Sequence, residues 1–190
     1  MLDSSCALID NDFLNHALEI KESEDKILEL ISLIFNVLDK TPTIHPWIAS
    51  YELMSENKLV QKITESVITI ATWNDIHGGD EISKRYYCTL FKELHKKIHG
   101  EDLSLVGNDV FTHCIRRQNL GELHNITACM FCGCNLILSD DEDSKRFKKI
   151  IQQTTTCNFN VYTRQEVAEI IRGRDGSPGR KALRVFAHKA

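Results

Sequence analysis

The chain has 190 residues, enough to bury one sizeable hydrophobic core, so the simplest organisation is a single domain. Hydrophobic residues make up 42% of the sequence and charged residues 26%, a composition that argues against a disordered protein. The formal net charge of −4 argues against a protein that coats nucleic acid through general basicity.

The longest apolar runs fall far short of the ~20 residues that a membrane-spanning helix needs. The first residues lack the basic region and the small-residue cleavage site of a signal peptide. The seven cysteines are odd in number and irregularly spaced, which favours reduced thiols over a disulfide framework. We therefore expect a cytoplasmic protein that does not contact a membrane.

The first half of the chain mixes short apolar runs with helical patterns. Residues 6–10, CALID, form an apolar run that stops at an acid, which is typical of a buried strand. Ser23 and the two acids after it predict a helix start, and the apolar residues of 27–38 follow at helical spacing. Pro46 suits the first position of a short helix. The β-branched residues of 66–73 indicate another strand.

The second half has a clearer order. The expected elements are a helix at 109–117, a helix opened by Gly121 and closed by Gly133, a strand at 135–138, a helix from Asp143, and a strand at 158–162. The sequence TRQE at 163–166 has the spacing of a capping box and predicts one more helix. Strands that alternate with helices predict a three-layer α/β/α domain with a mainly parallel central sheet.

Four carboxylates fall where such a sheet binds ligands, beyond the carboxyl ends of its strands. Asp10 ends the first apolar run, and Asp141 follows the strand at 135–138. Glu52 lies after the short helix that begins at Pro46, and Glu122 lies in the first turn of its helix. Taken singly, each acid also fits a helix cap or a solvated charge.

Together, the four acids form a pattern that needs a cation. Like charges in a partly buried cluster resist joint ionisation, and a hard divalent cation such as Mg²⁺ relieves that repulsion. A bound metal can supply a nucleophile from water and stabilise the departing oxygen of a phosphodiester. The acidic residues therefore predict a metal-dependent nuclease site.

Two basic segments could contact the phosphates of a nucleic acid. SKRFKK at 144–149 directly follows the acidic run, and Arg172 to Lys189 carries six Lys or Arg against one acid. The candidate nucleic-acid-binding residues are Lys145, Arg146, Arg180 and Arg184. Solvated helix faces remain the alternative interpretation of both segments.

The same stretches resemble the PIN-domain family of nucleases. CALIDNDFL is similar to the family's first strand, and TIHPWIASYEL to its second acidic position. LGELHNITACMFCGCNLILSDDEDSKRF resembles the segment with an acid on a helix, a Gly turn, a strand and a polar-x-Asp motif. The resemblance is closest to the subgroup with Gly-Glu at the third position and paired aspartates at the fourth. It implies one PIN-like domain over 1–190, with a helical insertion at about 55–108 and a basic C-terminal segment at 172–190.

Carried over by position, the resemblance assigns roles to individual residues. The implied catalytic acids are Asp10, Glu52, Glu122 and Asp141. The implied metal ligands are Asp10, Glu122, Asp141 and Asp143, and the auxiliary residues are Asp12, Ser139 and Asp140. The polar-x-Asp spacing from Ser139 selects Asp141 as a ligand and leaves Asp140 to cap the following helix or to hold a metal-bound water.

The resemblance also implies a cofactor, Mg²⁺ or Mn²⁺, and an endoribonuclease activity on RNA or another nucleic acid. Many PIN domains are toxins of toxin–antitoxin pairs, so a protein antitoxin or inhibitor and a homodimer are partners that the resemblance allows.

Two other interpretations stay open. LIDNDFL also resembles the Asp-x-Asp strand end of haloacid-dehalogenase-type phosphatases, in which Asp10 would be the nucleophile and Asp12 its acid/base. Phe13 stands where that family has Thr or Gly, and Glu52 and Glu122 would have no role. The third interpretation is an inactive PIN fold that only binds nucleic acid or a partner.

Overall fold

The structure is a computed structural model that describes residues 2–53, 57–100, 102–103, 110–111 and 119–187. The strands are β1 (Cys6–Ile9), β2 (Thr41–Ile44), β3 (Thr69–Ile70), β4 (Leu136–Leu138) and β5 (Asn160–Tyr162). The helices are α1 (Asn11–Leu18), α2 (Glu24–Leu38), α3 (Pro46–Tyr51), α4 (Lys58–Ser66), α5 (Trp73–His77), α6 (Glu81–His99), α7 (Leu120–Cys132), α8 (Glu142–Gln152), α9 (Arg164–Ile171) and α10 (Arg180–Ala187). The predicted helix at 109–117 lies largely outside the described residues.

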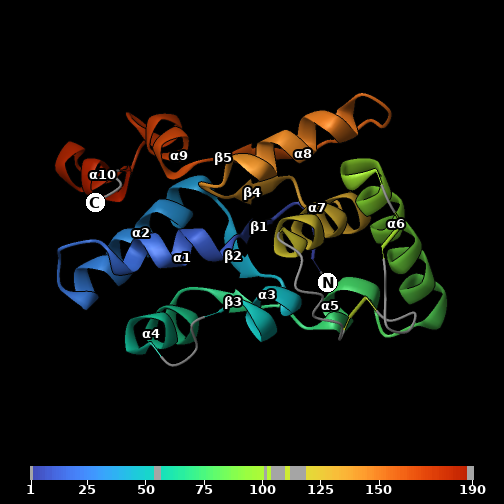
Figure 1. Cartoon of the computed structure of the whole chain (residues 1–190). Helices are drawn as coiled ribbons and strands as arrows, with labels where there is room; N and C mark the ends of the chain where they lie inside the picture. Colours follow the sequence, from blue (N-terminus) through green and yellow to red (C-terminus); the bar gives the residue numbers. More distant parts are fainter. Residues whose placement is uncertain (1, 54–56, 101, 104–109, 112–118, 188–190) are drawn as a thin grey trace.

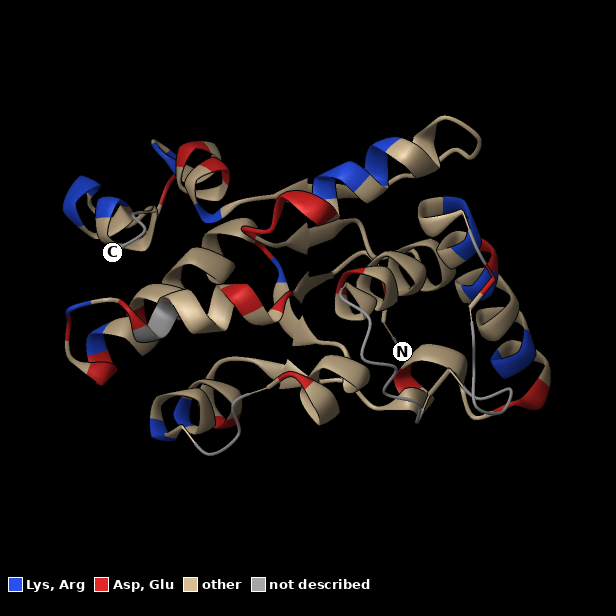
Figure 2. Cartoon of the chain, in the orientation of Figure 1, with Lys and Arg blue, Asp and Glu red and all other residues tan. Residues whose placement is uncertain are grey.

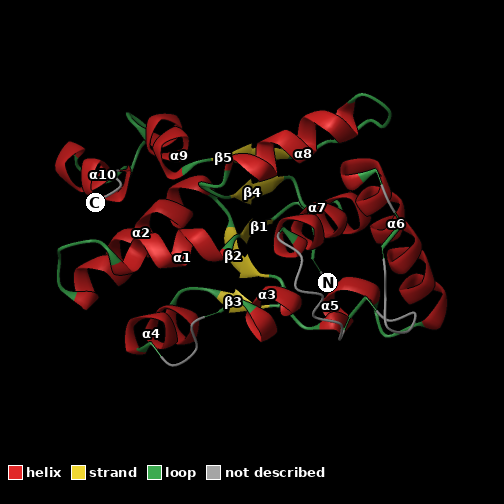
Figure 3. Cartoon of the chain, in the orientation of Figure 1, coloured by secondary structure: helices red, strands yellow, loops and turns green. Residues whose placement is uncertain are grey.

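The strands form one parallel sheet in the order β3-β2-β1-β4-β5. Helices α1, α2, α4, α9 and α10 pack with one another on one face, and α6, α7 and α8 pack with one another on the other (Figures 1 and 3). The predicted three-layer α/β/α class is thereby confirmed.

The central strand β1 is buried along its whole length, because the sheet extends on both sides of it and helices cover both faces. This explains why CALI is continuously apolar instead of alternating. On one face, the ring of Phe13 in α1 meets those of Phe35 in α2 and Phe186 in α10, at centroid distances of 6.2 and 5.9 Å.

The sequence does not predict β2, because Pro42 removes a backbone donor from the strand. The proline is tolerated because the neighbouring strand β3 is short. That strand pairs only with Thr43 and Ile44, so it does not reach Pro42. The same strand belongs to the segment 55–108, which therefore contributes a sheet edge as well as α4, α5 and α6.

The strand order reverses between β1 and β4. From β1 the chain continues to β2 and β3 on one side of the sheet, whereas β4 and β5 lie on the other side. In open α/β sheets a crevice forms at this point, beyond the carboxyl ends of the two strands, and ligands bind in it. Asp10 follows β1 directly and Ser139 follows β4 directly.

Among the described helices, none combines the length and the apolar character that crossing a lipid bilayer requires. The cysteines described, which are Cys6, Cys88, Cys129, Cys132, Cys134 and Cys157, are all free thiols.

Candidate active site

Asp10 is the buried centre of the acidic cluster, with 3% of its surface exposed. Its backbone N–H donates to the carbonyl of Leu138 at 3.0 Å, which fixes it between β1 and β4. Its carboxylate accepts hydrogen bonds from the Ser139 hydroxyl at 2.9 Å and from the Asn11 backbone at 3.0 Å. Burial, and then the charges of Glu122 and Asp12, raise the pKa of Asp10 well above its ordinary value in spite of these two bonds.

Glu52 follows α3, and its carboxylate lies against the backbone of Gly121. A Cβ atom at position 121 would come within 2.6 Å of Oε2 and 2.7 Å of Oε1 of Glu52, so only glycine leaves room for this carboxylate where it stands. Burial and the charge of Asp10 raise the pKa of Glu52 to about 7, although a hydrogen bond from the Gly121 backbone opposes the shift.

Glu122 lies in the first turn of α7, one residue after Gly121. Burial, together with the charges of Glu52, Asp141 and Asp12, raises the pKa of Glu122 to about 7, while its own backbone N–H opposes the shift. The N-cap residue of α7, Asn119, makes no side-chain capping bond and instead donates to Oδ2 of Asp143 at 2.7 Å. Figure 2 shows the acidic residues gathered at the starts of α7 and α8.

Ser139 connects the acids that follow β1 and β4. Its hydroxyl donates to Asp10 and accepts from the backbone N–H of Asp141 at 3.1 Å. It also lies 3.5 Å from Oδ2 of Asp12, although Asp12 already belongs to the first turn of α1. Burial and the charge of Asp140 raise the pKa of Asp12. The structure thus brings acids of two segments, the one after β1 and the one after β4, together around one hydroxyl.

The roles of the paired aspartates differ from the expectation. Asp141, and not Asp140, caps α8: its carboxylate accepts from the backbone of Asp143 at 2.8 Å. Asp140 instead contacts residues of α9 and α1. It accepts from Nε of Arg164 at 2.6 Å and from the Arg164 backbone at 2.9 Å, and Nδ1 of His16 lies 2.9 Å away.

The cause of this arrangement is the buried guanidinium of Arg164, which is only 2% exposed and needs a carboxylate. Burial alone would raise the pKa of Asp140, but the bonds from Arg164 outweigh it and leave that pKa lowered. Asp140 is therefore a structural partner of Arg164, unlike Asp10 and Asp12, whose pKa values are raised.

A hollow of about 750 Å³ adjoins the acidic run. Its charged lining consists of Asp140, Asp141, Glu142, Asp143, Lys145, Arg146 and Lys149. Two of the predicted phosphate-binding side chains are engaged with acids: Lys145 with Glu166 at 2.5 Å, and Arg146 with Asp143 at 3.0 Å. Arg184 lines a smaller hollow beside α9, and the exposed Arg180 lines neither of the two.

The donor chemistry of the cluster suits a hard divalent cation, because carboxylate oxygens are the ligands that Mg²⁺ and Mn²⁺ prefer. In the described part of the chain, none of Asp10, Glu52 and Glu122 forms an ion pair with a basic side chain. Over the same residues, however, no three His, Cys, Asp or Glu side chains are placed so that they could hold one ion. The donors therefore fit such a cation, but their described positions do not form a ready-made site.

Some residues at this edge were not predicted from the sequence. His16 lies four residues after Asp12 on α1, a spacing that places both on one helix face, and this signal was available. Lys149 is one helical turn after Lys145 on α8 and belongs to the same basic cluster. The partnership of Arg164 with Asp140 spans 24 residues and leaves no local pattern to read.

Comparisons with protein families, with curated proteins and with solved structures find no match for this chain.

Proposed function

We propose that this chain is a metal-dependent nuclease that hydrolyses phosphodiester bonds, with RNA as its expected substrate. The observation that carries the proposal is the convergence of Asp10, Glu52 and Glu122 at the crevice between β1 and β4, where each raises the pKa of another. Within the described residues, none of the three has a cationic side chain as partner.

Such a cluster destabilises the folded protein when its acids are ionised, because burying like charges without compensation is unfavourable. Protons can relieve the cost, and so can a divalent cation. Asp10, Glu122 and Asp141 are the residues that would hold Mg²⁺ or Mn²⁺, with Asp143 as a further acid. When bound, such an ion would supply a nucleophile from water and stabilise the departing oxygen of the phosphodiester.

The chain's own groups would assist in separate ways. Glu52 suits a general base, because a carboxylate with a pKa of about 7 can take up a proton on Oε1 or Oε2 near neutral pH. Ser139 would fix the position of Asp10 relative to the start of α8 through its two hydrogen bonds. Neither role requires movement of the backbone.

The surroundings offer a place for the substrate. Lys145, Arg146 and Lys149 of α8 line the hollow beside the acidic run. Figure 2 shows the basic residues along this helix. Phosphate groups could compete for Lys145 and Arg146, because their present partners lie at the surface, where ion pairs are weak. The resemblance of the motifs to PIN domains supports RNA as the substrate class.

The test is a cleavage assay with labelled single-stranded RNA and DNA, in Mg²⁺ and in EDTA. We expect the unaltered chain to cleave in Mg²⁺ and not in EDTA. Asp10→Asn should lose cleavage, whereas Glu65→Gln, which changes an exposed acid on α4, should keep full activity. Cleavage that persists in Asp10→Asn would contradict the proposal.

A small phosphomonoester run in parallel separates the alternatives. Hydrolysis of that ester, without cleavage of either nucleic acid, would favour the haloacid-dehalogenase interpretation. Binding of RNA without hydrolysis of any substrate would favour the inactive fold.

A further inference from the structure

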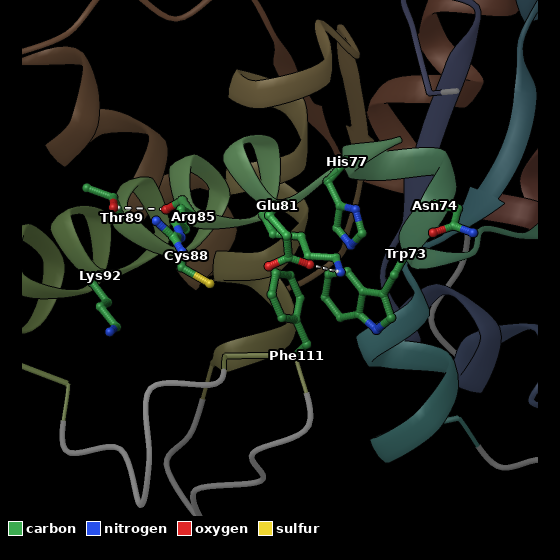
Figure 4. Close-up of a pocket in the computed structure, with 10 residues that line it drawn as sticks. Trp73, Asn74, His77, Glu81, Arg85, Cys88, Thr89, Lys92 and Phe111 are labelled. Atoms are coloured by element: carbon green, nitrogen blue, oxygen red, sulfur yellow. Dashed lines mark hydrogen bonds and ion pairs between the residues drawn. The ribbon is translucent and has the colours of Figure 1, made fainter. Parts of the chain in front are cut away.

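A second hollow, of about 860 Å³, lies over α5 and α6 and shares no lining residue with the one beside the acidic run (Figure 4). Its aromatic lining comes from Trp73, at the start of α5, and from Phe111, whose rings meet edge to face at 4.6 Å. Both side chains are only partly buried. The hollow therefore presents aromatic surface to solvent.

The wall along α6 is basic. Among the lining residues that the structure describes, Lys84, Arg85 and Lys92 stand against Glu81 as the one acid. Lys84 pairs with Glu81 at 2.6 Å, and both of these side chains are accessible. Although the chain carries a net charge of −4, basic side chains outnumber acidic ones among the described residues of this wall. Cations beside exposed rings are the combination that holds single-stranded nucleic acid, whose bases stack on the rings while its phosphates meet the cations.

A continuous series of ring contacts runs from this hollow to the acidic cluster. The ring of Trp73 lies 5.9 Å from that of His124, which lies 5.1 Å from Trp47, which in turn lies 5.2 Å from Tyr51. Tyr51 precedes Glu52, and His124 comes two residues after Glu122. The hollow and the acids are thus two ends of one packed unit formed by α3, α5 and α7.

We propose that the hollow over α5 and α6 binds a single-stranded segment of nucleic acid, with bases stacked on Trp73 and Phe111 and phosphates on Arg85 and Lys92. The site would hold the part of the strand that lies beyond the cleavage position. This role rests on the proposed nuclease function, but binding itself requires neither metal nor cleavage.

The experiment uses the intrinsic fluorescence of Trp73. The chain has two tryptophans, so Trp47→Phe leaves Trp73 as the reporter. Titration with a short oligoadenylate in EDTA should quench this fluorescence to saturation. Arg85→Gln with Lys92→Gln should weaken binding about tenfold and reduce the salt slope by roughly 1.4, because each single-strand phosphate contact contributes about 0.7. Lys58→Gln with Lys62→Gln, on α4 in the opposite layer, is the charge-matched control and should leave both quantities unchanged.

Because Trp47 is buried and its replacement could disturb folding, the same affinities are also measured by anisotropy of a labelled oligoadenylate with the natural tryptophans. The proposal is overturned by absence of binding in the anisotropy assay, by equal weakening in the control pair, or by equally tight binding of a polyglutamate peptide, which would indicate an acidic protein partner.

The outcome is distinguishable from that of the nuclease proposal. If Asp10→Asn and the unaltered chain bind the oligoadenylate equally but neither cleaves RNA in Mg²⁺, the nuclease proposal fails and the binding site stands. If RNA is cleaved and the Arg85 and Lys92 substitutions change neither affinity nor salt slope, the binding site fails and the nuclease proposal stands.

Discussion

The carboxylate of Glu52 occupies the space that a side chain at Gly121 would need. Both oxygens of Glu52 would be closer than 3 Å to a Cβ atom at that position, although the two residues lie 69 positions apart in the sequence. The glycine at the start of α7 therefore leaves room for an acid that follows α3. This explains physically why a small residue precedes Glu122 in the motif LGEL.

Gly121→Ala should displace Glu52 without unfolding the protein. The atoms that the new methyl group meets are the far end of a flexible side chain, so the carboxylate can move, and alanine favours the helix by about 1 kcal/mol over glycine. We expect cleavage to fall by about 100-fold, in the range typical for loss of a general base. Urea unfolding and the cleavage assay measure the two effects separately.

Gly179→Ala is the control, because a Cβ at position 179 would meet nothing within 4 Å. It should leave cleavage unchanged. Wild-type cleavage in Gly121→Ala would show that the position of Glu52 does not matter.

The raised pKa of Glu52 predicts a pH-dependent stability difference. Between about pH 4.5 and pH 7 the folded protein keeps a proton on Glu52 that the unfolded chain releases, so the contribution of Glu52 to stability falls as the pH rises through this window. Burial lowers the pKa of His45 from 6.5 to about 3, so its contribution to stability rises with pH between these two values. The pH dependence of the wild-type free energy of unfolding therefore combines two opposite effects. The difference between Glu52→Gln and the wild type isolates the glutamate.

In EDTA, the free energy of unfolding of Glu52→Gln relative to the wild type should therefore increase from about pH 5 to about pH 7 and then level off. Urea titrations across this range measure it, with the exposed Glu65→Gln as the flat reference. A difference that shrinks with rising pH would contradict the assigned environment of Glu52.

Substitutions of Asp140 and Asp141 should have different effects, the first on stability and the second on cleavage. Asp140→Asn removes the carboxylate from the buried Arg164, and loss of one partner of a buried ion pair costs about 3 kcal/mol. Asp141→Asn keeps an N-cap, because asparagine caps a helix as well as aspartate does, so its stability should stay near that of the wild type.

Cleavage should follow the reverse order. We expect measurable cleavage by folded Asp140→Asn and none by Asp141→Asn at any Mg²⁺ concentration. An active Asp141→Asn together with an inactive but fully stable Asp140→Asn would contradict this assignment. It would place Asp140 in catalysis instead of Asp141.

Local patterns predicted the elements that hold the site. An apolar run that ends in Asp10 gave β1, and the spacing of Thr163 and Glu166 gave a capping box whose two backbone bonds are present at 2.8 and 3.2 Å. The parallel sheet followed from the alternation of elements. These features depend on neighbours in the sequence, which is why they could be read from it.

Long-range partners could not be read in this way. The spacing from Ser139 distinguished Asp141 from Asp140 as a candidate ligand, but the contact of Asp140 with Arg164 of α9 left no local pattern in the sequence. Strand β2 was missed because the tolerance for Pro42 depends on how far β3 extends along it. The engagement of Lys145 by Glu166 likewise joins residues of α8 and α9 that lie 21 positions apart in the sequence.

The most direct test of the acidic cluster as a cation site is the release of protons when Mn²⁺ binds. Burial and mutual repulsion raise the pKa of Glu52 and of Glu122 to about 7 and that of Asp10 well above its ordinary value, so these carboxyl groups hold protons near pH 7. A cation bound among them must displace such protons. A weakly buffered solution with a pH indicator should record this release on addition of Mn²⁺ at pH 7, much less at pH 9, and less in Glu122→Gln. Absence of proton release at pH 7 under saturating Mn²⁺ would contradict a metal site built from these carboxylates.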